Sequence, residues 1–206
     1  ALASIARERG ISIASHDDDS AEKLAFMDGL EASISEFPIS LDVAREARAR
    51  GLHTVAGAPN VMLGHSHSGN LSAREAVEAG AIDVLCSDYY PAALLDAVFT
   101  LRDECGLDIA RAFALVSVNP AKAAGIADEV GSLAVGKRAD VLLVHEIACG
   151  EAGTRTMPVV TRAFVGGHSV FRSHYPDQPL GYARDLGERI DAARADAARA
   201  LFPEAV

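Results

Sequence analysis

The sequence lacks the features that identify several large classes of protein. Its three cysteines, Cys86, Cys105 and Cys149, are odd in number and far apart, so we predict neither a disulfide framework nor a paired-cysteine zinc site. No apolar run approaches the roughly 18 residues that a transmembrane helix needs. The first residues, ALASIARERG, do not have the layout of a signal peptide. These absences favour a reducing, cytoplasmic location and predict no membrane partner.

Positive charge is also scarce. The 206 residues include 19 Lys and Arg against 29 Asp and Glu, which gives a formal net charge of −10. Non-specific binding to nucleic acid depends on Lys and Arg contacts with phosphates, so no nucleic-acid partner is predicted. What the chain does contain is apolar residues, at 50% of the sequence, which is enough for a buried core in one or two domains.

Short apolar runs alternate with helical segments through the first half of the chain. The strand-like runs cover 11–15, 34–40, 53–58 and 81–87, and a helical pattern follows each of them. Strands and helices that alternate at spacings of roughly 20 to 30 residues predict right-handed βα units, a parallel sheet and therefore an α/β fold. In such sheets, functional residues gather beyond the carboxyl ends of the strands.

The pattern changes after residue 107. Helices are predicted in DIARAFALVSV and NPAKAAG, and from Gly131 a period close to two predicts antiparallel strands with glycine turns. The segment from Gly181 predicts a solvated helix. The sequence therefore divides into a βα part over 1–127, a small β subdomain over 128–175 and a helical tail over 176–206.

Three ionisable side chains stand at the ends of predicted strands. His16 offers an imidazole, a common metal ligand, and Asp88 offers a carboxylate that can bind a metal and accept a proton from its water. Glu36 interrupts an apolar run, where an ionised carboxylate is costly unless it is paired or metal-bound. Ordinary alternatives stay open: a solvated His16 beside helix-capping aspartates, Asp88 as an N-cap or turn residue, and Glu36 at an outward strand end.

The loop over 59–70 is dense in hydrogen-bonding groups. Gly64 and Gly69 let the backbone approach a ligand closely, and the helix predicted from Ser72, with Glu75 in a capping box, adds the positive end of a dipole. We interpret the loop as a substrate-binding segment for phosphate oxygens, and a flexible loop with capping residues is the alternative. The candidate substrate contacts are Asn60, His65, Ser66, His67, Ser68 and Asn70.

The later part of the chain resembles the amidohydrolase superfamily. The residues that carry this resemblance are NPAKAAGI (119–126), GSLAVGKRADVLLV (131–144) and TRAFVGGHSVF (161–171), and it extends over about 11–172. Further segments resemble a diphosphatase subgroup of phosphonate catabolism. These are ASHDDDS (14–20), ISEFPIS (34–40), GAPNVMLGHSHSGNLSA (57–73) and CSDYYPAALLDAV (86–98).

The resemblance implies a TIM-like (β/α)8 metal-dependent hydrolase barrel. The chain would supply strands five to eight, part of a small β-sandwich and a C-terminal helix. His16 then matches the metal histidine of strand five, and Asp88 matches the aspartate of strand eight that binds metal and water. Glu36 stands where a second histidine is usual, so either it is a ligand or the metal count is lower. The HSH at 65–67 does not match a superfamily ligand motif.

Other superfamily ligands are absent from this sequence. The HxH of strand one and the ligand near strand four do not occur, and four strands cannot close an eight-stranded barrel. We therefore expect a missing N-terminal barrel half as a partner, either in another chain or elsewhere in the protein. Assembly into a homo-oligomer is left open.

The resemblance also implies an activity. It is hydrolysis of a phosphoric anhydride in a phosphorylated ribose phosphonate, a small-molecule substrate, with release of pyrophosphate and with Asp88 as the catalytic residue. The implied cofactor is a divalent metal, with zinc expected and manganese or magnesium as alternatives. Two other functions stay open: an amidohydrolase that acts on a cyclic amide or N-acyl C–N bond, and a non-catalytic half-barrel scaffold.

Overall fold

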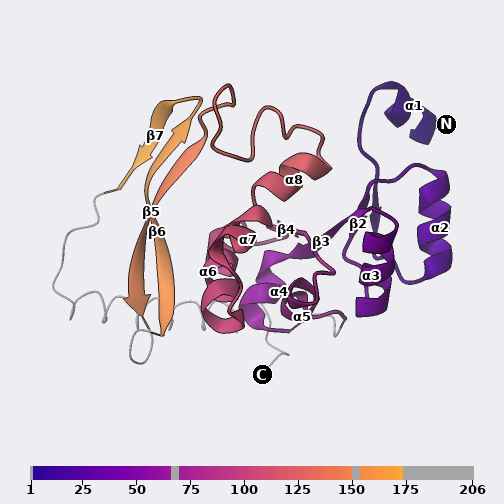
Figure 1. The fold of residues 1–206 in the computed structure, drawn as a ribbon, viewed down its shortest axis with the longest axis horizontal. Helices are drawn as coiled ribbons and strands as arrows, with labels where there is room; N and C mark the ends of the chain where they lie inside the picture. The colour runs from indigo at the N-terminus through magenta and orange to yellow at the C-terminus, as the bar shows by residue number, and fades with distance from the viewer. Residues whose placement is uncertain (1, 66–69, 150–153, 174–206) are drawn as a thin grey trace. The chain divides into compact units, whose positions relative to one another are not determined.

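The computed structural model describes residues 2–65, 70–149 and 154–173, and Figure 1 shows the elements in order. The chain divides into two compact units between Lys137 and Arg138. The sequence placed this division earlier, at 127/128. The Lys137 ammonium donates to the carbonyl oxygen of Ala127 and, at 2.8 Å, to the hydroxyl of Ser132, which attaches the intervening segment to the first unit. The predicted tail helix lies outside the described residues.

The first unit contains a four-stranded parallel sheet in the order β1-β2-β3-β4. The strands are β1 (Ala14–His16), β2 (Ile34–Glu36), β3 (His53–Gly57) and β4 (Val84–Cys86). This confirms the predicted α/β fold with a parallel sheet. All four strands are shorter than the apolar runs from which they were predicted. In the second run, Phe37 takes a left-handed φ of 55°, and the strand ends before it.

Helices follow the strands as the alternating pattern predicts. They are α1 (Leu2–Glu8), α2 (Ala21–Gly29), α3 (Leu41–Ala49), α4 (Ala58–Leu63), α5 (Ala73–Glu78), α6 (Ala93–Cys105), α7 (Ile109–Ala114) and α8 (Val118–Ala123). Ser20 and Ser40 cap α2 and α3 by accepting hydrogen bonds from the backbone N–H groups of Lys23 and Val43, both at 3.3 Å.

Two local predictions differ from the structure. The polar loop predicted over 59–70 begins with helix α4, because Pro59 suits a first helical turn and Val61 is fully buried against the core. Ser72 occupies the N-cap position of α5, as predicted, but its side chain makes no capping hydrogen bond within the described residues. The capping hydrogen bond predicted for Ser72 is therefore wrong. Asn60 supplies an acceptor at the start of α5 instead, because the N–H of Ala73 donates to Asn60 Oδ1 at 3.0 Å.

The two faces of the sheet have different partners. Ser15, Ser35 and Thr54 are register neighbours on one face and are buried. The residues that follow them, His16, Glu36 and Val55, point to the opposite face because side chains alternate along a strand. On that opposite face, α8 packs through Ala123 onto Val55 and Val84. In Figure 1, α8 accordingly lies on the opposite side of β3 and β4 from α4 and α5.

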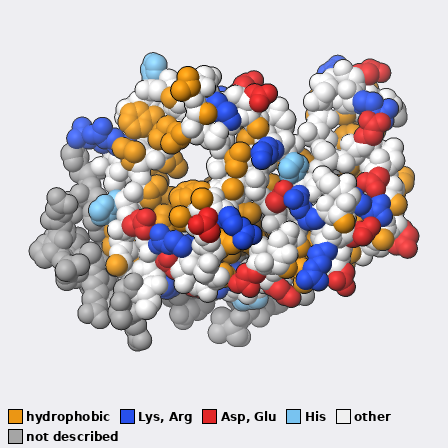
Figure 2. All heavy atoms as spheres, viewed as in Figure 1, with side chains coloured by type: hydrophobic (Ala, Val, Ile, Leu, Met, Phe, Trp, Pro, Cys, Tyr) orange, Lys and Arg blue, Asp and Glu red, His pale blue; other side chains and the backbone are white. Residues whose placement is uncertain are grey.

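The outer surfaces of α2 and α3 are charged. Arg50 of the turn after α3 pairs with Asp28 at 2.5 Å and with Glu46 at 2.9 Å, and Arg45 lies 3.8 Å from Asp42. Figure 2 shows acidic and basic side chains interspersed there. No helix in the described part of the chain has both the length and the apolar character to cross a membrane.

The second unit is an antiparallel sheet of three strands, β5 (Val141–Cys149), β6 (Arg155–Val165) and β7 (His168–Arg172). The antiparallel strands predicted from the period of two are confirmed, although strand structure begins at Val141, well after Gly131. Ile147, Cys149 and Met157 form its buried cluster. At the β6–β7 turn the Asp140 carboxylate accepts a hydrogen bond from the N–H of Gly166, which together with Arg138 lowers the pKa of Asp140.

A partly buried carboxylate stabilises the opposite edge of the parallel sheet. Asp83, just before β4, accepts hydrogen bonds from the Arg48 guanidinium, the backbone N–H of Thr54 and the ring Nδ1 of His53, each at 2.8 Å. These partners belong to α3 and to the start of β3. Asp83 therefore connects three elements at the amino ends of the strands, where βα folds place residues that serve stability rather than chemistry.

We predict that Asp83→Asn destabilises the protein. The amide keeps the volume but loses the charge and part of the acceptor capacity, so the free energy of unfolding should fall by roughly 1–3 kcal/mol. Urea unfolding followed by circular dichroism measures this. Asp42→Asn, on a side chain that is 97% exposed, is the matched control and should change it by less than about 0.5 kcal/mol. Equal effects of the two substitutions would contradict the role of Asp83.

Candidate functional site

Two candidate metal ligands meet at the carboxyl edge of the parallel sheet. His16 and Glu36 are the last residues of β1 and β2 and are partners in the ladder. The Nε2 atom of His16 lies 4.0 Å from Oε2 of Glu36, and its Nδ1 atom lies 3.1 Å from Oδ2 of Asp17. The imidazole also makes an edge contact with the Phe37 ring, with 5.2 Å between centroids. The structure thus places an imidazole and two carboxylates around one strand end.

The backbone at this edge is strained. Of the four described non-glycine residues with positive φ angles, three lie at this edge: Asp17, Phe37 and Asp88, at 53°, 55° and 50°. Each follows the end of a strand, β1, β2 or β4, at the same edge of the sheet. Left-handed conformations are costly for such residues and cluster where a side chain must be aimed. The left-handed backbone turns the chain sharply at Asp17, next to His16, at Phe37, next to Glu36, and at Asp88 itself.

Asp88 reaches over the end of β3. A Cβ atom added to Gly57, the last residue of that strand, would lie 3.1 Å from Oδ2 of Asp88 and 3.6 Å from a ring carbon of Phe37. Glycine therefore leaves the space that the carboxylate occupies. The φ of Gly57 is −76°, an ordinary value for any residue, so the reason for glycine here is close approach rather than backbone freedom.

The nearby thiol of Cys86 is not poised for chemistry. Burial raises the pKa of Cys86, and the negative charges of Glu36 and Asp88 raise it further, although a hydrogen bond from the Asp88 backbone opposes them. At neutral pH the group is therefore a protonated thiol, whereas nucleophiles and metal ligands need the thiolate. The carboxylates of Glu36 and Asp88, from different strands, thus act electrostatically on a common neighbour.

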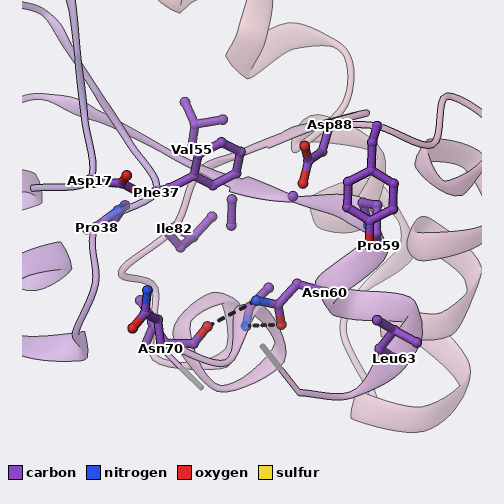
Figure 3. Close-up of a pocket in the computed structure, with 15 residues that line it drawn as sticks. Asp17, Phe37, Pro38, Val55, Pro59, Asn60, Leu63, Asn70, Ile82 and Asp88 are labelled. Carbon is purple, nitrogen blue, oxygen red and sulfur yellow. Dashed lines mark hydrogen bonds between the residues drawn. The ribbon is translucent and has the colours of Figure 1, made fainter. Parts of the chain in front are cut away.

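A cavity of about 240 Å³ opens at this edge (Figure 3). Its polar lining comes from Asp17, Asn60, Asn70, Asp88 and Tyr89. The remainder is apolar and includes Phe37, Pro38, Val55, Pro59, Leu63, Leu71 and Ile82. None of these described lining residues is Lys or Arg, so the wall carries negative charge alone. An anionic ligand would need a cation from elsewhere.

The predicted substrate contacts are distributed unevenly around the cavity. Asn60 and Asn70 line it, whereas His65 is exposed and does not, and its Nδ1 lies 3.0 Å from the carbonyl oxygen of Leu63. Ser66, His67 and Ser68 lie outside the described residues. Asn60 also holds the end of the loop, because its amide donates to the carbonyl oxygen of Leu71 at 3.1 Å (Figure 3).

The residues present fit a metal site in part. His16 and Glu36 offer nitrogen and oxygen donors of the kinds that zinc and manganese accept, and both side chains are accessible, at 58% and 35% exposure. Within the described residues, however, no three His, Cys, Asp or Glu side chains lie close enough to hold an ion. Asp88 does not complete the pair there. We call this pair a half-site, because a metal ion bound there would need further donors from beyond the described residues.

Sequence reasoning missed two residues, of which the first is Asp18. It was interpreted as part of a helix-capping cluster, but Ser20 caps α2, and Asp18 is fully buried with its Oδ2 atom 2.5 Å from the hydroxyls of both Ser15 and Ser35. The available signal was the serine at the centre of β1 and of β2, where a buried βα sheet usually carries a branched apolar residue. Gly57, whose space Asp88 occupies, was also missed.

Comparison with known proteins extends these observations. The model of the amidohydrolase family matches residues 1–170. The α-D-ribose 1-methylphosphonate 5-triphosphate diphosphatase of Escherichia coli K12 is 42% identical over 146 residues, which cover 70% of this chain and 38% of that protein. The chain therefore spans well under half of the curated relative it matches.

Solved structures agree at the level of the fold. An amidohydrolase from Thermotoga maritima is 19% identical, and the two structures superpose with a TM-score of 0.60. The match covers 80% of this chain and 44% of the Thermotoga chain. An enamidase of the amidohydrolase superfamily is 13% identical with a TM-score of 0.62, covering 86% and 52%. Since the family match takes in both the strand ends that carry His16, Glu36 and Asp88 and most of the antiparallel sheet, the chain belongs to the amidohydrolase family.

Proposed function

We propose that the protein is a metal-dependent hydrolase that converts α-D-ribose 1-methylphosphonate 5-triphosphate to the 5-phosphate and pyrophosphate. The observation that carries this proposal is the 42% identity to the Escherichia coli diphosphatase, over a stretch equal to 70% of this chain. The site geometry is compatible with it, because candidate ligands and a carboxylate gather at the carboxyl edge of a parallel sheet, beside a cavity. The described strands would be the second half of an eight-stranded barrel.

Each candidate residue has a defined role in the proposed reaction. The oxygen of water bonds to the α-phosphorus, the bond from that phosphorus to the α–β bridging oxygen breaks, and pyrophosphate leaves with the bridging oxygen. Asp88 Oδ2 accepts the proton of the attacking water, and the left-handed backbone at Asp88 aims the carboxylate over β3. His16 and Glu36 would hold the metal. When bound, the metal lowers the pKa of water and offsets phosphate charge.

Charge determines which part of the substrate each region can bind. The described cavity wall carries Asp17 and Asp88 without a Lys or Arg, so on its own it repels a triphosphate. The metal and donors beyond the described residues must supply the positive field. Zinc is the proposed metal, with manganese or magnesium as alternatives because two of the three candidate ligands are carboxylates. Contact of His65, Ser66, His67 and Ser68 with phosphate oxygens stays a prediction.

A second function is favoured by one observation. The cavity wall is mostly apolar and acidic, which suits a neutral ring better than a polyanion. A cyclic amide or N-acyl substrate, cleaved at a C–N bond, would fit that wall, and a D-hydantoinase from Thermus sp. shares the fold with a TM-score of 0.54 at 17% identity.

We predict that the intact protein releases pyrophosphate from the ribose triphosphate and leaves dihydropyrimidines unchanged. Removal of metal with a chelator should abolish release, and added zinc, manganese or magnesium should restore it to different extents, which identifies the metal. His16→Ala and Glu36→Ala should each lower the bound metal measured by mass spectrometry. Hydrolysis of the dihydropyrimidine without pyrophosphate release would replace the proposal by the C–N alternative. A folded protein that binds no metal and has neither activity would favour the scaffold.

We predict that Asp88→Asn lowers kcat by at least about 100-fold, since the proton acceptor is removed. The amide has the same volume, so the melting temperature should stay within a few degrees of the parent value. Asp42→Asn, on the exposed face of α3, is the control and should leave kcat unchanged. Near-normal turnover by Asp88→Asn would remove Asp88 from the mechanism.

Gly57→Ala tests the placement of Asp88 without changing Asp88 itself. The added methyl carbon would lie 3.1 Å from Oδ2, so the carboxylate must shift. Even a displacement well under an ångström would move the carboxylate out of alignment with the attacking water. We therefore expect kcat to fall on the order of 10-fold with KM little changed. Gly29→Ala, where no atom lies within 4 Å of the added carbon, is the matched control. Equal kcat values for the two variants would show that the contact has no catalytic consequence.

A further inference from the structure

Asp18 occupies an environment that is costly for a carboxylate. It is 0% exposed, both serine hydroxyls donate to its Oδ2 atom, and its Oδ1 atom has no hydrogen-bond partner within the described residues. The nearest positive charge is the Lys23 ammonium, 3.8 Å from Oδ1. Burial of a charge with incomplete hydrogen bonding is unfavourable, and a helix cap would not require it. The position therefore has another use.

The two serines connect Asp18 to the candidate ligands. Ser15 directly precedes His16, Ser35 directly precedes Glu36, and these residues pair across the ladder at the same two register positions. Because successive side chains point to opposite faces, the serines lie behind the face that carries the His16–Glu36 pair. One carboxylate oxygen, at 2.5 Å from each hydroxyl, thus bridges β1 and β2 from the back.

The chain around Asp18 is held by further bonds from the same two strand ends. The N–H of Asp17 donates to the carbonyl oxygen of Glu36 at 2.9 Å, and the N–H of Ile39 donates to that of Asp18 at 3.0 Å. The Lys23 ammonium donates to the carbonyl oxygens of His16 and Asp17, at 2.7 and 2.8 Å. The left-handed φ of Asp17 lets the chain turn from one face of the sheet to the other within two residues.

We infer that Asp18 is a positioning residue that, through Ser15 and Ser35, fixes the separation of the His16 and Glu36 side chains and so sets the metal affinity of this half-site. The inference rests on the proposed function for the part that concerns the metal. Outer hydrogen-bond partners of ligands typically change metal affinity by 10- to 100-fold when they are removed. Here the partner acts on the strands rather than on the ligands themselves.

Zinc affinity of the intact protein, measured by competition with a chelator, tests the inference. Asp18→Ala should weaken zinc binding by at least about tenfold. Asp18→Asn should weaken it less, because an amide oxygen can still accept from the serines. Ser35→Ala removes one of the two hydroxyls, so its zinc affinity should lie between that of Asp18→Ala and that of the parent. It keeps the inference testable if the Asp18→Ala protein fails to fold. Asp19→Asn, at the exposed neighbouring position, should bind zinc normally.

Backbone hydrogen exchange supplies a readout that needs no metal. In Ser35→Ala and Asp18→Asn, exchange should rise at the amides of Asp17 and Ile39, which join the β1 and β2 ends, while the amide of Leu85 in β4 keeps its protection. A uniform rise that follows the melting temperature, with unchanged zinc affinity, would overturn the positioning role and leave Asp18 a stability residue. A parent protein that binds no zinc, manganese or magnesium would instead overturn the proposed function, and the exchange pattern alone would then decide the positioning role.

Discussion

The register of the parallel ladder is the constraint on which the site depends. It pairs His16 with Glu36, Glu36 with Val55 and Val55 with Val84, so one row of side chains on the same face crosses all four strands. Gly57 and Cys86 pair two residues further along β3 and β4. A slip of one residue would turn the row toward the helices, because the side-chain period of a strand is two. Asp83 at one edge and Asp18 at the other connect adjacent strands, so the register is held from both ends.

Much of the fold was predictable because it follows from local chemistry. Four apolar runs with helical patterns between them indicated parallel strands, and the serines at positions 20 and 40 stand where helices begin. The strand-end positions of His16, Glu36 and Asp88 were predictable for the same reason. Helix α4 was not, because a Gly, Pro and Asn sequence is equally typical of a turn, and the decision between them depends on the burial of Val61, a tertiary effect.

The site itself was less predictable, since distance depends on packing rather than on order in the chain. Sequence reasoning grouped Asp18 with its exposed neighbours, yet the left-handed turn at Asp17 sends it to the opposite face. Sequence reasoning also gave Asn60 a ligand role without the loop contacts it makes. The resemblance to a known family supplied the ligand hypothesis, but the half-site geometry came from the structure.

The left-handed residues Asp17, Phe37 and Asp88 have a consequence for engineering. Each conformation costs roughly 1–3 kcal/mol, so three of them at one edge are a substantial fraction of a typical domain stability. Glycine at any of them would relieve that cost, and at Asp88 or Asp17 it would also delete a carboxylate from the cavity wall. Selection of variants for heat resistance alone would therefore tend to remove the polar groups of the cavity before it improved the core. At the ends of β1 and β4, thermal stability therefore competes with the acidic lining of the cavity.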